Sequence, residues 1–84
     1  MDIELDLKSI FSNVLKVAPE RVGNLEMETT ESWDSFSHIS LMMEIEQNML
    51  HGDIDAETIP ELTSFEKCFI YIKKCREAEH VRKG

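Results

Sequence analysis

The chain has 84 residues, and seventeen Asp and Glu against nine Lys and Arg give a formal net charge of -8. A chain of this length buries a small core, so we expect one domain without a deep, walled-off catalytic cavity, which argues against an enzyme that works alone. The acidic charge disfavours nucleic acid and anionic membranes, because both repel it, and favours a protein partner with a basic patch.

The charge is unevenly distributed along the chain. Residues 1–66 hold fifteen acids and three bases (net -12), whereas residues 67–84 hold two acids and six bases (net +4). No apolar run approaches the length of a membrane span, and Met1-Asp2-Ile3-Glu4 has neither the basic start nor the apolar stretch of a signal peptide. We therefore expect a cytoplasmic protein that does not insert into membranes. We also expect a monomer.

The cysteines and histidines indicate neither a disulfide nor a metal site. Cys68 and Cys75 are seven positions apart, which in a helix separates them by about 10 Å along the axis, beyond disulfide reach. His38, His51 and His80 are scattered, with no Cys or His at zinc spacing.

The first predicted helix covers residues 3–17, where apolar residues recur on one face: Ile3, Leu7, Ile10, Phe11, Val14 and Val17. Pro19 and a following Gly-Asn turn signal then favour a long loop over residues 18–33. We expect Leu25 and Met27 to pin that loop to the core.

The second predicted helix, residues 35–50, is apolar on two sides. One stripe consists of Leu41, Met42, Ile45 and Met49, and the other of Phe36, Ile39, Met43 and Leu50. One stripe suffices to close a small core. The second either stays exposed as a docking patch, for which flexible Met side chains are suited, or is buried by neighbouring helices.

The rest of the chain predicts two more helices. A short one is expected over residues 55–60, and a longer one from Phe65 to about Glu79, opened by a capping box of Thr63 and Glu66. The tail, residues 80–84, is expected to fray. The pattern as a whole predicts a single all-α domain over residues 1–84.

The segment from Glu31 to Glu46 carries the most informative motif. It places a serine hydroxyl at the first turn of an acidic, apolar helix, directly after a carboxylate. Asp34-Ser35-Phe36 resembles the Asp-Ser-Leu tripeptide that opens the second helix of acyl and peptidyl carrier proteins. The resemblance continues through the later helices and covers nearly the whole chain.

This resemblance implies a four-helix bundle of acyl-carrier type with a long loop between helices 1 and 2 and a short third helix. Ser35 would carry 4'-phosphopantetheine, transferred from coenzyme A by a separate transferase with Mg²⁺, and Asp34 would help to position the transferase-bound metal. The partners would be that transferase and the enzymes that load and condense acyl or aminoacyl groups. The carrier itself would catalyse nothing.

Further roles are expected for residues of the second and the last predicted helices. The predicted docking residues are Phe36, Ile39, Met43, Glu44 and Glu46. The candidates for a cleft that shelters an acyl chain are Met42, Ile45, Met49, Phe65, Phe69 and Ile72, although an ordinary packed core explains the same residues. Trp33 before the motif and Phe36 in place of the usual Leu look more like specialised carriers than like those of bulk fatty-acid synthesis.

A plainer interpretation competes with the carrier. Asp34 or Ser35 can serve simply as a helix N-cap, since both residue types are preferred there. The protein would then be an unmodified acidic adaptor that binds a basic partner through its second helix.

His38 lies on the core-side arc of the second predicted helix. It is predicted to be a partly buried, hydrogen-bonded residue and not a catalyst, because no nucleophile lies beside it.

Overall fold

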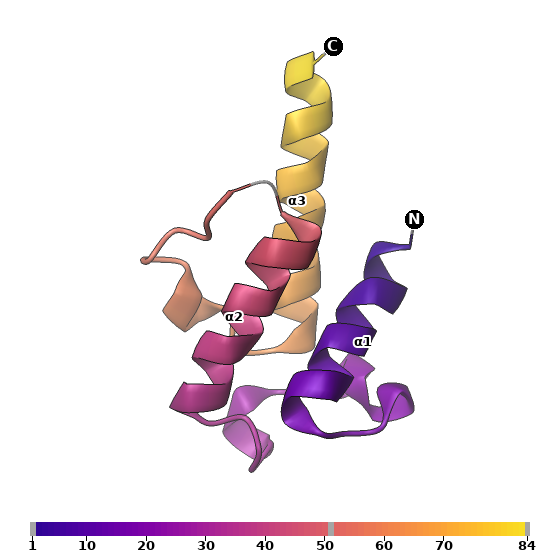
Figure 1. Ribbon diagram of the computed structural model, residues 1–84, viewed down its shortest axis with the longest axis vertical. Helices are drawn as coiled ribbons and strands as arrows, with labels where there is room; N and C mark the ends of the chain where they lie inside the picture. The colour runs from indigo at the N-terminus through magenta and orange to yellow at the C-terminus, as the bar shows by residue number, and fades with distance from the viewer. Residues whose placement is uncertain (1, 51, 84) are drawn as a thin grey trace.

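The computed structural model describes residues 2–50 and 52–83, with side chains described as far as Glu77. Its three α-helices are α1 (Ile3–Leu15), α2 (Ser35–Met49) and α3 (Phe65–Lys83). Three short 3₁₀ helices lie in the connections: η1 (Pro19–Asn24), η2 (Met27–Thr29) and η3 (Ile59–Glu61). The helices pack into a small bundle from which the end of α3 projects (Figure 1). The described residues contain no strand, so the predicted all-α fold class is confirmed.

Helix α1 begins where predicted and ends two residues early. Asp2 caps its first turn through Oδ1. At the other end Lys16 adopts a left-handed conformation (φ 59°, ψ 44°) and donates its backbone N–H to the Ser12 carbonyl. The Ser12 hydroxyl in turn donates to the Val17 carbonyl at 2.6 Å. This local cap turns the chain out of the helix after Leu15.

The connection between α1 and α2 is more ordered than the long loop that was predicted, because it contains η1 and η2. It is tied to the start of α3 by an isolated antiparallel bridge. Met27 N–H donates to the Thr63 carbonyl at 2.8 Å, and Phe65 N–H donates to the Leu25 carbonyl at 3.0 Å. Leu25 and Met27 also pack half-buried against the core, which confirms that they anchor this segment.

The bridge also decides how α3 begins. The Ser64 hydroxyl accepts a hydrogen bond from the backbone N–H of Lys67 at 3.1 Å, so Ser64 is the capping residue. The predicted capping box of Thr63 and Glu66 is therefore wrong by one position. The reason is the pairing with the segment after η1, which engages the Thr63 carbonyl and leaves Ser64 as the last residue before the helix.

Two other boundaries differ from the prediction. The short helix expected over residues 55–60 is η3, in which Pro60 lies in the first turn. Proline is tolerated there because the first turn needs no N–H from it and its φ is already helical. Helix α3 continues to Lys83, so the tail that was predicted to fray is helical up to that residue. Residues 65–83 contain no Gly or Pro that would end the helix earlier, and Gly84 lies outside the described residues.

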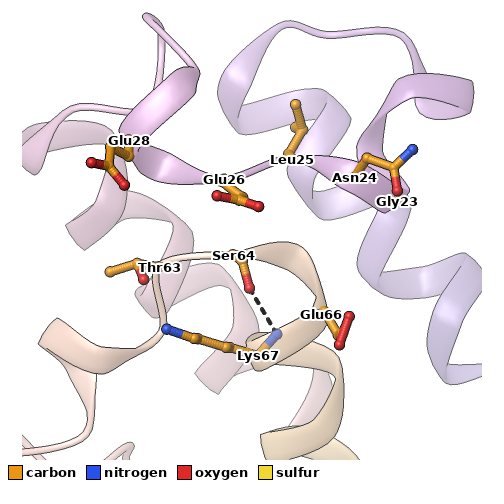
Figure 2. A pocket seen from close by; sticks show the side chains of 9 residues that line it. All are labelled: Gly23, Asn24, Leu25, Glu26, Glu28, Thr63, Ser64, Glu66 and Lys67. Carbon is orange, nitrogen blue, oxygen red and sulfur yellow. Dashed lines mark hydrogen bonds between the residues drawn. The ribbon is translucent and has the colours of Figure 1, made fainter.

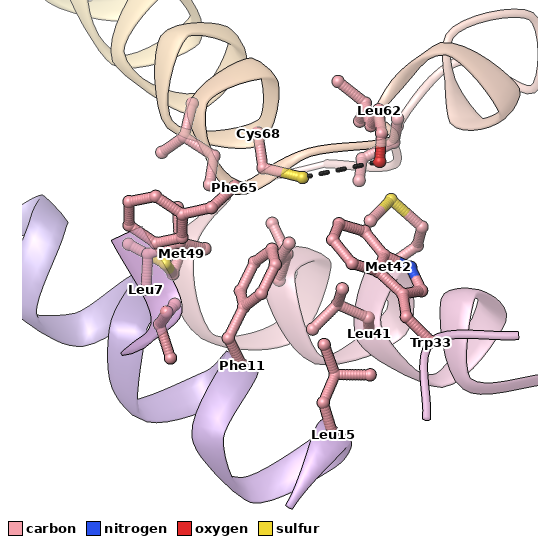
Figure 3. Close-up of a cluster of buried hydrophobic side chains, with 14 residues drawn as sticks. Leu7, Phe11, Leu15, Trp33, Leu41, Met42, Met49, Leu62, Phe65 and Cys68 are labelled. Atoms are coloured by element: carbon pink, nitrogen blue, oxygen red, sulfur yellow. Dashed lines mark hydrogen bonds between the residues drawn. The ribbon is translucent and has the colours of Figure 1, made fainter. Parts of the chain in front are cut away.

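The core is organised around one aromatic ring of α1. The Phe11 ring lies 5.2 Å from the rings of both Trp33 and Phe65, edge to face in each case (interplanar angles 88° and 78°) (Figure 3). One stripe of α2 joins this cluster, and each member is at most 2% exposed: Leu41, Met42, Ile45 and Met49. This stripe is the one that closes the core.

Candidate functional site

The start of α2 is set by the carboxylate of Asp34. Its backbone is extended, and its Oδ1 accepts a hydrogen bond from the Ser37 backbone N–H at 2.8 Å, which is the geometry of an N-cap. Hydrogen bonds from Ser37, first the backbone N–H and then the hydroxyl, lower the pKa of Asp34 below its ordinary value of 3.8. The carboxylate is therefore ionised at neutral pH and fills the capping role.

Ser35 is the first residue of α2 and is exposed. Its hydroxyl forms no hydrogen bond with any residue that the structure describes. Because Asp34 performs the capping, the Ser35 hydroxyl can be esterified without loss of the cap. The free backbone N–H groups and positive dipole end of a helix start favour an anionic group attached there.

An exposed apolar surface follows Ser35 on the same helix. Phe36 is 85% exposed, Ile39 53% and Met43 52%. We call these three residues the α2 patch. Among the described residues only Leu5 and Ile70 are large, apolar and comparably exposed, so the exposed apolar surface is concentrated on α2. The second apolar stripe of this helix is thus exposed over these three positions.

The two predicted docking carboxylates lie in different surroundings. Glu44 is exposed and, with Phe36 and Met43, lines a shallow groove of about 400 Å³ between the end of α1 and α2. Glu46 instead accepts a hydrogen bond from the Ile54 backbone N–H at 2.8 Å and holds the segment that follows α2. The structure therefore groups Glu44, and not Glu46, with the α2 patch.

The residues considered for an acyl cleft lie inside the bundle. Met42, Ile45, Met49, Phe65 and Ile72 are each at most 4% exposed, and all belong to the hydrophobic core. Phe69 is half-buried and stacks parallel to Phe65, with ring centroids 6.3 Å apart. These contacts are those of a packed core.

A hydrogen-bonded pair links the residue before Asp34 to η3. The Trp33 Nε1–H donates to His38 Nδ1 at 2.9 Å, and His38 Nε2 lies 2.7 Å from the Ile59 carbonyl oxygen. An indole N–H can only donate and a carbonyl can only accept, so His38 must be neutral with its proton on Nε2. The predicted burial and hydrogen bonding of His38 are confirmed, since it is 6% exposed.

Trp33 is a residue of the candidate site to which the sequence pattern assigned no role there. It is 2% exposed and packs edge to face on Phe11 while its ring stacks on His38 at 5.9 Å. The available signal was a large aromatic directly before the helix cap, five positions before a core-side histidine. Trp33 anchors the segment that presents Ser35.

A second cavity lies on another part of the molecule, between residues 23–28 and the start of α3 (Figure 2). It has a volume of about 520 Å³, and its lining includes the carboxylates of Glu26, Glu28 and Glu66 and the side chain of Lys67. Among the described residues no group of three or more His, Cys, Asp or Glu is placed to hold a metal ion.

The cysteines are both free, as their spacing predicted. Burial raises the pKa of Cys68 to about 12, and its Sγ lies 3.7 Å from the Leu62 carbonyl oxygen. A buried thiol with so high a pKa is a poor nucleophile at neutral pH. The other two histidines of the metal argument, His51 and His80, lie outside the described side chains.

Comparison with known proteins adds no family assignment: no protein-family model matches the chain, and no curated protein does. Within the described part of the chain, no helix is long and apolar enough to cross a membrane.

Proposed function

We propose that this protein is a carrier that holds acyl or aminoacyl groups as thioesters on a 4'-phosphopantetheine arm attached to Ser35. The observation that carries the proposal is the exposed hydroxyl of Ser35, free of hydrogen bonds to described residues and preceded by the ionised cap Asp34. The resemblance of Asp34-Ser35-Phe36 to carrier attachment sites supports it.

Attachment would be a phosphoryl transfer from coenzyme A. The Ser35 oxygen forms a bond to the phosphorus next to pantetheine, the bond from that phosphorus to the bridging oxygen breaks, and adenosine 3',5'-bisphosphate leaves. The hydroxyl proton passes to a base of the transferase. The resulting phosphodiester carries one negative charge at the α2 N-terminus, where the helix dipole stabilises it by about 0.3 to 1 kcal/mol. The attached arm supplies the thiol that holds the cargo.

The other groups of the site serve recognition. The Asp34 carboxylate, ionised at neutral pH, is available to a Mg²⁺ ion held by the transferase. The α2 patch offers an apolar surface beside Ser35 to the transferase and to the loading and condensing enzymes, and Glu44 adds negative charge for a basic partner. We propose a carrier and not a catalyst.

The test is the intact mass of the protein after incubation with coenzyme A, Mg²⁺ and a broad-specificity phosphopantetheinyl transferase. The parent and a Ser32→Ala control, which removes an exposed hydroxyl three residues before the site, are expected to gain one phosphopantetheine each. Ser35→Ala is expected to gain none. Modification of Ser35→Ala, or no modification of the folded parent by several transferases, would overturn the proposal.

The exposed α2 patch also favours a second candidate, an unmodified acidic adaptor that binds a basic partner. The two candidates differ in their dependence on Ser35. If the protein is an adaptor, the parent and the Ser35→Ala variant bind the partner with equal affinity. If it is a carrier, the variant cannot hold cargo.

A further inference from the structure

A second exposed face lies on α3, away from the helix that carries Ser35. Lys67, Ile70, Tyr71 and Lys74 follow one another at i, i+3, i+4 and i+7, the spacing that places residues on one face of a helix. Ile70 is 44% exposed, both lysines are exposed and Tyr71 is half-buried. We call these four residues the α3 stripe.

The α3 stripe forms one wall of a groove of about 540 Å³. The opposite wall comes from η3 and the residues beside it, including Pro60 and Leu62. The groove therefore has an apolar floor and wall from Ile70, Tyr71, Pro60 and Leu62. A concave surface of this kind accepts a protruding apolar side chain.

The lining of the groove holds two lysines and one carboxylate residue, a net charge of +1 in a chain whose net charge is -8. Neither Lys67 nor Lys74 forms an ion pair with a described carboxylate. Both belong to a segment, residues 67–84, with a net charge of +4 in a chain of -8. Glu61 is the one carboxylate residue in the lining of the groove. Two lysines about 10 Å apart along the helix axis thus flank an apolar centre. Lys67 also lines the cavity that contains Glu26, Glu28 and Glu66, whose carboxylates offset part of its charge.

We infer that the α3 stripe docks an acidic amphipathic segment of a partner protein. An aliphatic side chain of the partner enters the groove beside Ile70, and carboxylates on either side of it face Lys67 and Lys74, the charge complementarity that favours encounter and fixes register. A flat anionic membrane fits the face less well, because the groove is concave and residues 1–66 carry a net charge of -12.

This inference goes beyond the proposed function because it requires neither Ser35 nor a phosphopantetheine arm. It also predicts a division of partners by charge. Basic partners bind the α2 patch beside Glu44, and acidic partners bind the α3 stripe. One chain can then hold two partners of opposite charge on two different helices.

The test is a ¹H–¹⁵N NMR titration of the full chain with synthetic helical peptides that share one apolar register and differ only in flanking residues: Glu, Gln or Lys. The Glu peptide is expected to shift the amides of the α3 stripe and η3, and the Lys peptide those of the α2 patch. Lys74→Glu should lower the affinity for the Glu peptide by about fivefold or more, since it turns an attraction into a repulsion. Glu61→Gln should raise the affinity for the Glu peptide, because it removes a negative charge from the lining of the groove.

Lys73→Glu is the matched control, because it makes the same charge change at an adjacent exposed position that lines a different cavity, beside Asp2 and Ile3. Both variants must first show the parent circular dichroism. The inference would be overturned if the two variants weakened binding of the Glu peptide equally, or if the Gln peptide shifted the same amides as much as the Glu peptide. It would also be overturned if the Glu peptide caused no shift, or if the α3 amides shifted only with phosphatidylglycerol vesicles. Ser35→Ala should titrate like the parent, so failure here is separable from failure of the carrier proposal.

Discussion

Met42 and Met43 are neighbours of the same residue type on the same helix, yet they have opposite environments. Met42 is 2% exposed within the core, whereas Met43 is 52% exposed in the α2 patch. Successive residues of a helix point about 100° apart, and the rest of the bundle covers the Met42 side of α2. The two stripes of α2 are therefore similar in hydrophobicity but differ in role: one stabilises the fold, and the other stays exposed on the surface.

Alanine substitution of the two methionines should separate these roles most strongly. Met42→Ala leaves a cavity in the core and should reduce the free energy of unfolding by about 2 to 5 kcal/mol. Met43→Ala removes an exposed side chain and should change it by no more than about 0.5 kcal/mol. Urea unfolding followed by circular dichroism measures both. Similar losses for the two variants would contradict the division.

The buried pair beside the site should give the next largest effect. Trp33→Phe keeps most of the aromatic packing but leaves His38 Nδ1 buried without its donor, which should cost about 1 to 3 kcal/mol of unfolding free energy. A double-mutant cycle with His38→Gln isolates the bond from the packing. Strictly additive single and double variants would show that the two rings are not coupled.

The exposed stripe should affect recognition and not stability. Phe36→Ala should lower kcat/KM of the transferase for this chain by about tenfold, because a large exposed aromatic beside the acceptor is a typical contact of a binding surface. Leu5→Ala is the control, since Leu5 is 63% exposed on α1. If both variants are modified at the parent rate, the α2 patch does not bind the transferase.

The smallest effect is expected at the cap. The pKa of Asp34 is lowered in the folded protein, so its contribution to stability is present above the unfolded value of 3.8 and is lost as the pH falls through the lower folded value. A ¹³C NMR titration of the carboxyl should give a midpoint below 3.8. Asp34→Asn should keep the cap while slowing modification of Ser35, whereas Asp34→Ala should weaken both. Equal modification of Asp34→Asn and the parent would exclude a role for the charge.

The helix boundaries show which features the local sequence pattern predicts and which it does not. The core of each long helix followed from 3.6-residue periodicity, and the motif already placed Ser35 at a helix start. The ends deviated where a contact or a backbone conformation intervened: Lys16 ended α1, and the pairing of residues 25–27 with 63–65 made Ser64 the cap of α3. Such details depend on partners that lie far away in the sequence.

By itself, the sequence determined the all-α class, the apolar faces and the position of an unusual serine after a carboxylate, because these depend on neighbours within one or two helical turns. Tertiary structure decided which stripe of α2 is exposed, that His38 reaches Ile59 across 21 positions, that Glu46 holds Ile54, and that Ile70 and Tyr71 face a groove. The physical reason is that periodicity marks a face as apolar, whereas only the packing of distant segments determines what covers that face.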